Sequence, residues 1–295
     1  MGRLVYDVAS ALSRGACDIQ QDSLIMDFPF GTDMGYMILA DGMGGHASGE
    51  IASNIVVTEM FAELKFKIGE LSDHEDQIPS ILMNAAACAN DCIGDFVSQN
   101  PESFGMGSTV VAPIIVQNRL YWISIGDSPL YLFRDGELRQ LNEDHSLASD
   151  IDAMVKTGLI TEEQGRSHPD RNCLKSVLIG AAISKIDCPD TPFELQCDDI
   201  LIASSDGLQT LTNEQIRKLV ADKCEQSGHE IVQTLMTAVE SLDSYEQDNI
   251  SISVIKVSEP IEAEVRISDI GTNLGEFEGV VQAGPTRILT AVSGH

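Results

Sequence analysis

Positive charge is scarce in this sequence. Its 295 residues include 18 lysines and arginines against 46 aspartates and glutamates, which gives a formal net charge of −28 at pH 7. A surface this negative repels nucleic acid and anionic lipid, and it attracts cations or basic segments of a partner. We therefore expect no nucleic-acid partner and no membrane association. Solubility explains the acidity more simply than a specific basic partner does, and net charge does not reveal whether some carboxylates bind metal.

Long apolar runs and paired cysteines are also missing. No run approaches the roughly 20 residues that a membrane-spanning helix needs. The N-terminal stretch MGRLVYDVASALSRG lacks the apolar core and the small-residue cleavage site of a signal peptide. The seven cysteines are scattered, odd in number and without the spacing of a zinc site, which argues against a disulfide framework and for a reducing compartment. The prediction is a cytoplasmic protein.

Short apolar runs predict strands, and longer periodic runs predict helices. The strand-like runs are rich in Ile, Val, Leu and aromatic residues, and they cover 36–41, 108–116, 119–126, 130–136, 199–206 and 249–257. Apolar residues recur at helical spacing in 47–65, 78–98, 213–222 and 228–242, and the segments TEEQ (161–164) and TNEQ (212–215) have the form of capping boxes. VQNRL (116–120) and RDGEL (134–138), the second with an Asp-Gly signal, predict hairpin turns. Hairpins in place of alternating strand–helix units favour antiparallel sheets with helices on their faces. The predicted class is α+β.

Four aspartates lie at or beside the ends of these predicted strands: Asp41, Asp127, Asp206 and Asp248. Asp22, in the segment IQQDSLIMD, adds a fifth. A lone carboxylate at a buried strand end is costly, because its charge then needs a partner or a cation. Since basic residues are scarce, a divalent ion such as Mg²⁺ or Mn²⁺, which prefers oxygen ligands, is the natural compensator. Gly42 could offer its carbonyl, because a residue without Cβ lets the backbone approach an ion closely. One Asp-Gly pair is more often a turn than a ligand, so spacing alone leaves both interpretations open.

Six segments in order resemble one enzyme family: QQDS (20–23), ADGMGGHASGE (40–50), GSTVV (107–111), GDSPLYLFRDGELRQLNEDHS (126–146), SSDGL (204–208) and DNISISV (248–254). Each is weak alone, but together they resemble the bacterial branch of the metal-dependent protein phosphatases (PPM, type 2C). The resemblance implies a central antiparallel β-sandwich flanked by helix pairs in α-β-β-α layers. It implies a phosphatase domain over 1–258 with a flap insert at about 147–185. Residues 259–295 are then an appendage, either a tail or an extra strand.

The resemblance also implies roles for these aspartates and for Gly42. Asp41 would bridge two Mg²⁺ or Mn²⁺ ions, and the carbonyl of Gly42 would bind the second. Asp206 and Asp248 would complete the protein ligands of the first ion. Asp22 would orient metal-bound water without binding an ion itself.

Two further residues receive weaker assignments from the resemblance. Asp127 would match the ligand of a third, weaker ion that it shares with Asp206. His46 is a candidate proton donor to the leaving alkoxide, with a structural role as an equal alternative, because the animal branch carries its histidine where this chain has Met43. His145 is expected to brace a strand end.

The implied activity is hydrolysis of phosphoserine and phosphothreonine in proteins. Two divalent ions can lower the pKa of a shared water and neutralise charge on the phosphoryl oxygens, so that the bridging water attacks phosphorus in line without a cysteine nucleophile. The implied substrates are phosphorylated proteins, the products of a Ser/Thr kinase, and the chain is expected to act as a monomer.

Two positions depart from the family pattern. Cys17 stands five residues before Asp22, where the family commonly has an arginine that grips the substrate phosphate, and Pro129 replaces the arginine of GDSR. A thiol cannot reproduce the bidentate fork of arginine, so we expect weaker substrate binding with catalysis retained. The alternative is a catalytically weak or inactive phosphatase-fold module that acts as a binding or regulatory protein. The intact set of predicted metal ligands favours the enzyme.

Overall fold

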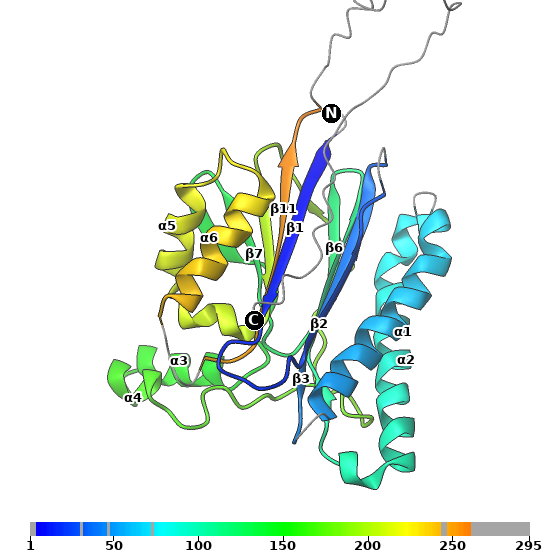
Figure 1. Ribbon diagram of the computed structural model, residues 1–295, viewed down its shortest axis with the longest axis vertical. Helices are drawn as coiled ribbons and strands as arrows, with labels where there is room; N and C mark the ends of the chain where they lie inside the picture. The colour runs from blue at the N-terminus through cyan, green and yellow to red at the C-terminus, as the bar shows by residue number, and fades with distance from the viewer. Residues whose placement is uncertain (1–3, 30–31, 46–47, 72–73, 243–246, 261–295) are drawn as a thin grey trace, which may run out of the picture.

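The computed structural model describes residues 4–29, 32–45, 48–71, 74–242 and 247–260. Two antiparallel sheets face each other, and a pair of helices covers the outer face of each (Figure 1). This confirms the α+β layered sandwich that the sequence predicted. His46, the candidate proton donor, lies outside the described residues. Residues 261–295, which make up most of the predicted appendage, also lie outside them.

The first sheet has the spatial order β1 (Val5–Ser13), β11 (Ile250–Ser258), β10 (Ile200–Ser204), β7 (Leu130–Arg134) and β8 (Glu137–Gln140). Its outer face is covered by α5 (Asn213–Ala221) and α6 (Gly228–Glu240) (Figure 1). Strand β11 alternates as a two-faced strand should: Ile250, Ile252 and Val254 pack toward these helices, while Ile255 and Val257 pack between the sheets.

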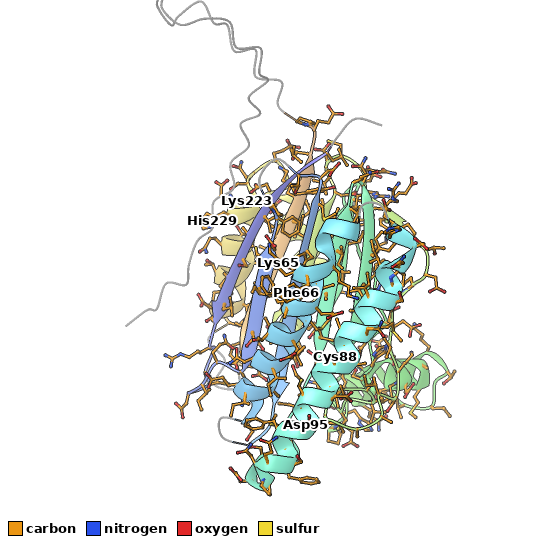
Figure 2. The ribbon with its side chains drawn as sticks, turned by 90° about the vertical axis from the view of Figure 1, so that its right-hand side faces the viewer. Lys65, Phe66, Cys88, Asp95, Lys223 and His229 are labelled. Carbon is orange, nitrogen blue, oxygen red and sulfur yellow. The ribbon has the colours of Figure 1, made fainter. Side chains whose placement is uncertain are left out.

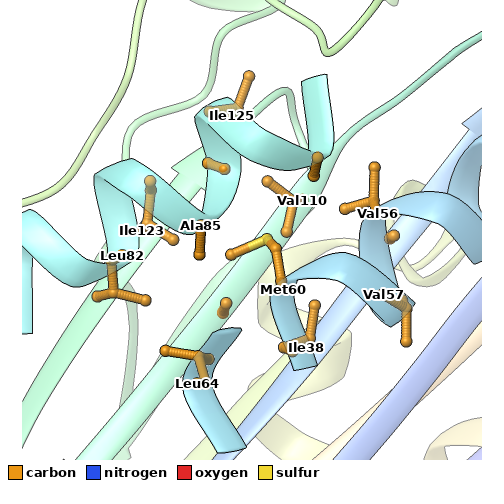
Figure 3. Packing of buried hydrophobic residues seen from close by; sticks show 14 of the residues in the cluster. Ile38, Val56, Val57, Met60, Leu64, Leu82, Ala85, Val110, Ile123 and Ile125 are labelled. Carbon is orange, nitrogen blue, oxygen red and sulfur yellow. The ribbon is translucent and has the colours of Figure 1, made fainter. Parts of the chain in front are cut away.

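The second sheet has the order β2 (Asp22–Asp27), β3 (Met34–Met43), β5 (Val110–Val116), β6 (Arg119–Ile125) and β9 (Phe193–Glu194), and the short β4 (Gly107–Ser108) pairs with the end of β3. It is covered by α1 (Ser48–Leu71) and α2 (Ile78–Gln99). Figure 3 shows Met60 of α1 packing between Ala85 of α2 and Ile38 of β3. Burying a side chain of this kind stabilises the fold by roughly 1.5–3 kcal/mol. The opposite face of α1 is exposed, where Phe66 projects outward (Figure 2).

Turns and helix starts follow the local sequence. The two predicted hairpins form between β5 and β6 and between β7 and β8, and the second turn holds Asp135 and Gly136 at φ of 53° and 82°, as the Asp-Gly signal requires. Both predicted capping boxes are present, at Thr161 and Thr212. The segment between β8 and β9 contains α3 (Ala148–Lys156) and α4 (Glu162–Arg166).

Several elements of the structure were not predicted from the sequence. Strand β1 was not predicted, because its residues are half-buried along nearly the whole length and show no clear alternation. Three single-turn helices, η1 (Glu75–Gln77), η2 (Pro101–Ser103) and η3 (Asp206–Thr210), were also missed. The seven cysteines are free, as expected. In the parts of the chain that the structure describes, no helix has the length and apolar character that crossing a membrane requires.

Candidate metal centre

The five predicted acidic residues come from the strands and adjoining loops of both sheets and lie near enough for their charges to interact. Asp22 opens β2, Asp41 lies within β3, and Asp127 lies in the loop between β6 and β7. Asp206 opens η3 immediately beyond β10, and Asp248 lies just before β11. The negative charges of the other four all act on Asp41. Asp22 begins β2, a strand that was not among those predicted from the sequence.

Asp22 and Asp41 form a cross-strand pair. They are direct partners in the antiparallel register of β2 and β3, so their side chains lie on the same face of the sheet. Gly42, the next residue, donates its N–H to the carbonyl of Gln21 over 3.1 Å. A Cβ on Gly42 would lie 2.0 Å from the carbonyl oxygen of Gly49, so this position has room only for glycine. The main chain of Gly49 therefore packs directly against Gly42, the residue after Asp41.

The main chain of Asp41 is fixed by the segment GST at 107–109. Its carbonyl accepts from the Thr109 N–H over 2.8 Å and from the Ser108 hydroxyl over 3.0 Å, and its N–H donates to the Thr109 Oγ1 over 3.2 Å. The Thr109 hydroxyl in turn bonds the Ser128 hydroxyl at 2.7 Å. These contacts define where the Asp41 carboxylate is presented.

The pKa values of the cluster are raised chiefly by burial and further by the mutual repulsion of the carboxylates. Burial raises the pKa of Asp22 and of Asp206 to about 6, with the charge of Asp248 adding to both. The pKa of Asp127 rises to about 7, first by burial and then by the charge of Asp206. Burial, followed by the charge of Asp22, raises the pKa of Asp41 well above its ordinary value. No basic side chain is among the causes of these four shifts, so the cluster has unbalanced negative charge.

The residues fit a divalent metal by their chemistry. Asp22 is only 4 % exposed, and its Oδ2 accepts from the Ser205 hydroxyl over 2.8 Å. Its Oδ1 is buried without a hydrogen-bond partner among the described residues, although a buried carboxylate oxygen normally has one. An unpartnered oxygen beside three further buried carboxylates is the ligand chemistry of a hard cation. Within the described ranges, however, no three acidic, histidine or cysteine side chains already surround a common point, and Asp248 is exposed.

The loop at 14–21 lies against this cluster. Gly15, at φ +56°, approaches so closely that a Cβ would lie 2.2 Å from the carbonyl oxygen of Asp248. The Asn249 amide donates to the carbonyls of Arg14 and Ile19 over 3.0 and 3.1 Å. As a result the Cys17 thiol lies 3.6 Å from the Asp248 Oδ1 and donates to it.

No arginine replaces the phosphate-binding arginine that the sequence lacks, as far as the described residues show. Arg14 is exposed, and its guanidinium bonds the carbonyl of Asp18 over 3.1 Å. Pro129 is buried at the start of β7. The cluster therefore has a neutral thiol where the family pattern has a cation.

His145 braces the end of β6, as the sequence analysis expected. His145 is fully buried. Its main-chain N–H donates to the carbonyl of Gly126 over 3.0 Å, and its ring Nδ1 accepts from the Gly126 N–H over 3.3 Å. Burial lowers the pKa of this imidazole, so the neutral ring acts as an acceptor. Asp127 follows Gly126 directly and is positioned by this brace.

Sequence reasoning did not single out Thr109, Ser205 or Asn249, although all three contact the main chain or side chains of the cluster. Each lies inside one of the segments that carry the family resemblance. Small polar residues in strands also occur on ordinary solvent-facing surfaces, so sequence alone did not distinguish them. Their hydrogen bonds to partners distant in sequence are what identifies them.

Comparisons with known proteins find similarity over most of this chain. Residues 11–243 match the family model described as protein phosphatase 2C. The chain is 32% identical over 201 residues to the serine/threonine protein phosphatase PstP of Mycobacterium tuberculosis, which covers 67% of this chain and 36% of that protein. It is 31% identical over 220 residues to the serine/threonine phosphatase stp of Listeria monocytogenes, which covers 75% of this chain and 83% of that protein.

Solved structures are similar over most of the chain. The S. agalactiae serine/threonine phosphatase has a TM-score of 0.70 at 27% identity and covers 85% of this chain and 99% of that one. The catalytic domain of the phosphatase PstP, solved in complex with two manganese ions, has a TM-score of 0.67 at 28% identity and covers 87% of this chain and 100% of that one.

Proposed function

Because this chain belongs to the protein phosphatase 2C family, we propose that it is a Mg²⁺- or Mn²⁺-dependent protein serine/threonine phosphatase. The observation that carries the proposal is the meeting of five aspartates from two sheets, four of them buried enough to raise their pKa and none balanced by a basic residue. A buried cluster of this kind is stable at neutral pH only if it binds cations or retains protons.

We assign the residues of the cluster by position. Asp41 would hold both ions. The carbonyl of Gly42 would bind the second ion, and Asp206 and Asp248 would complete the protein ligands of the first. Asp22 would orient water through its unpartnered Oδ1.

A third, weaker ion would be held by Asp127, together with Asp206. Burial raises the pKa of Asp127 to about 7, and the charge of Asp206 adds to this shift, which supports the assignment. The phosphatase domain would span residues 1–258, with the segment containing α3 and α4 as its flap.

The protein itself supplies orientation. Thr109 and Ser108 fix the main chain of Asp41, and the His145 brace does the same for Asp127 through Gly126. When bound, two divalent cations would neutralise the phosphoryl oxygens and acidify a water molecule for in-line attack on phosphorus. The leaving alkoxide needs a proton, and His46 is the candidate donor that the sequence offers. Phosphorylated proteins made by a Ser/Thr kinase would be the substrates of this monomeric enzyme.

A second function is supported by one observation. The Cys17 thiol lies beside Asp248 where the family pattern has its phosphate-binding arginine, so the chain lacks a cation that would bind the substrate there. A phosphatase-fold module that binds metal and phosphoprotein with little turnover would have this feature. The intact carboxylates favour the enzyme, because binding alone does not require the whole set.

Hydrolysis of p-nitrophenyl phosphate and of a phosphothreonine peptide tests the proposal. We expect turnover with Mn²⁺, none after chelation, and a loss of about 100-fold or more in Asp206→Asn, comparable to the loss of one strong electrostatic contact in an active site. The matched control is Asp222→Asn, an exposed aspartate at the end of α5, which should retain wild-type rates. Metal-independent turnover would refute the proposal. Mn²⁺ binding by calorimetry without turnover of either substrate would establish the second function.

A further inference from the structure

Two adjacent serines at the end of β10 differ in their contacts. Ser204 and Ser205 are both completely buried. The Ser204 hydroxyl has no hydrogen-bond partner among the described residues, whereas the Ser205 hydroxyl donates to the Asp22 Oδ2 over 2.8 Å and accepts from the Ser251 N–H over 2.9 Å. The chain therefore contains both a candidate and its matched control at neighbouring positions.

The direction of these bonds is determined by proton counting. A serine hydroxyl has one proton to donate and can accept in addition. Because the Ser251 N–H donates to the Ser205 Oγ, the Ser205 proton is left for an acceptor. The Asp22 Oδ2 at 2.8 Å is closer than the alternative acceptor, the Asn249 carbonyl at 3.5 Å. The Ser205 N–H also donates to the Ser251 carbonyl over 3.0 Å, so Ser205 is held from both its main chain and its side chain.

This contact joins the two sheets at the acidic cluster. Asp22 belongs to β2 of the second sheet and stands opposite Asp41 of β3, whereas Ser205 follows β10 of the first sheet and directly precedes Asp206. One hydrogen bond thus connects the Asp22–Asp41 pair to the segment that carries Asp206. It also occupies one oxygen of Asp22 and leaves the other, Oδ1, unpartnered.

We propose that Ser205 is a positioning residue for the metal centre. By binding Oδ2, it holds the Asp22 carboxylate in the orientation that keeps Oδ1 available to the metal site, and it sets the spacing between the carboxylates of the two sheets. The inference rests on the proposed metal-dependent function. Partners that orient metal-site groups in this way typically change metal affinity by 10–100-fold when removed.

The test is calorimetric titration of the metal-free protein with Mn²⁺. We expect Ser205→Ala to bind Mn²⁺ about 10-fold more weakly than the wild type, at the low end of that range. Ser204→Ala should bind like the wild type, because its hydroxyl makes no hydrogen bond within the described chain. Ser205→Cys has a side chain of similar size but only a weak donor, so its Mn²⁺ affinity should lie between those of Ser205→Ala and the wild type. It also serves as the second variant if Ser205→Ala does not fold.

A double-mutant cycle separates positioning from a general loss of stability. If Ser205 acts through Asp22, then Ser205→Ala should have little further effect on Mn²⁺ affinity in an Asp22→Ala background. Equal Mn²⁺ affinity in Ser205→Ala and the wild type would overturn the inference and leave the proposed function intact. An equal weakening by Ser205→Ala with and without Asp22 would also overturn it. A wild-type protein that binds no Mn²⁺ would instead contradict the proposed function itself.

Discussion

Asp22 of β2 lies directly opposite Asp41 of β3. Like charges at facing positions of neighbouring strands destabilise a sheet, and here both carboxylates are buried. The arrangement is stable only if a proton is retained or a cation is present. A repulsive pair in an otherwise well-packed sheet is expected at a functional site, where ligand binding takes precedence over the stability of the metal-free fold.

Asp22→Asn should therefore separate stability from metal response. The amide keeps an acceptor for Ser205 and removes one buried charge, so we expect the metal-free protein at pH 8 to gain on the order of 2 kcal/mol in free energy of unfolding. The additional stability that Mn²⁺ provides should shrink, because it depends on the affinity of the folded state for the ion. Urea unfolding with a chelator and with Mn²⁺ measures both.

The control for this experiment is on the same strand. Asp27, at the other end of β2, faces Lys65 at 2.5 Å in a partly exposed ion pair, so Asp27→Asn should lose stability by about 1 kcal/mol or less. Its response to Mn²⁺ should equal that of the wild type. A destabilised Asp22→Asn with a full response to Mn²⁺ would contradict our interpretation of the pair.

The pH dependence of the metal-free protein follows from Asp127. Its pKa in the folded state, about 7, lies above the ordinary value, so its contribution to stability is fully present below about pH 4 and is lost as pH rises through 7. Between pH 5 and pH 8 the wild type should therefore lose more stability than Asp127→Asn, by an amount on the order of 2 kcal/mol. His145, whose pKa is lowered, contributes with the opposite sign, but it is present in both proteins and cancels in the difference. Equal pH profiles for the two proteins would refute this prediction.

The acidic cluster was predictable as a set, but its pairing was not. Asp41, Asp206 and Asp248 were identified because each lies beside a strong apolar run, which a sequence displays directly. The register that sets Asp22 opposite Asp41 depends on main-chain pairing between strands, and a shift of one residue would turn one of the two side chains to the other face. Local sequence does not specify that choice, so the pairing of Asp22 with Asp41 was not predicted.

Strand β1 and the Ser205–Asp22 contact were also missed because they depend on residues far apart in the sequence. Strand β1 is stabilised by nine paired residues of β11, which are more than 230 positions away in the chain, and its half-buried residues leave no periodic pattern. The Ser205–Asp22 contact spans 183 residues. In contrast, the capping boxes at Thr161 and Thr212 involve partners only three residues apart, and both were predicted correctly. Short-range chemistry is visible in the sequence, whereas contacts made by the sheets are not.

Gly42 provides a steric test of the centre. A Cβ here would lie 2.0 Å from the Gly49 carbonyl oxygen and 2.7 Å from that of Gln21, and neither main-chain group can move without displacing α1 or β2. We expect Gly42→Ala to destabilise the protein by about 2 kcal/mol or more, as overpacking does, and to weaken Mn²⁺ binding. Gly45→Ala is the control, because a Cβ there meets nothing within 4 Å. Thermal unfolding and calorimetry measure the two effects, and equal behaviour of both variants would contradict the prediction.

We predict that Cys17 limits how strongly a phosphorylated substrate binds. The thiol lies beside Asp248 on an exposed loop, so an arginine has room there and would give the site a cation with a forked donor. We expect Cys17→Arg to lower the KM for a phosphothreonine peptide by about 10-fold, the effect of one charge-assisted hydrogen bond, with a smaller change in kcat. The gain should shrink at high ionic strength, because salt screens exposed charges. Cys197→Arg adds the same charge at an exposed position near the far end of β11, and it should leave KM unchanged. If both variants lower KM equally, the gain reflects net charge, and Cys17 is not the position that limits substrate binding.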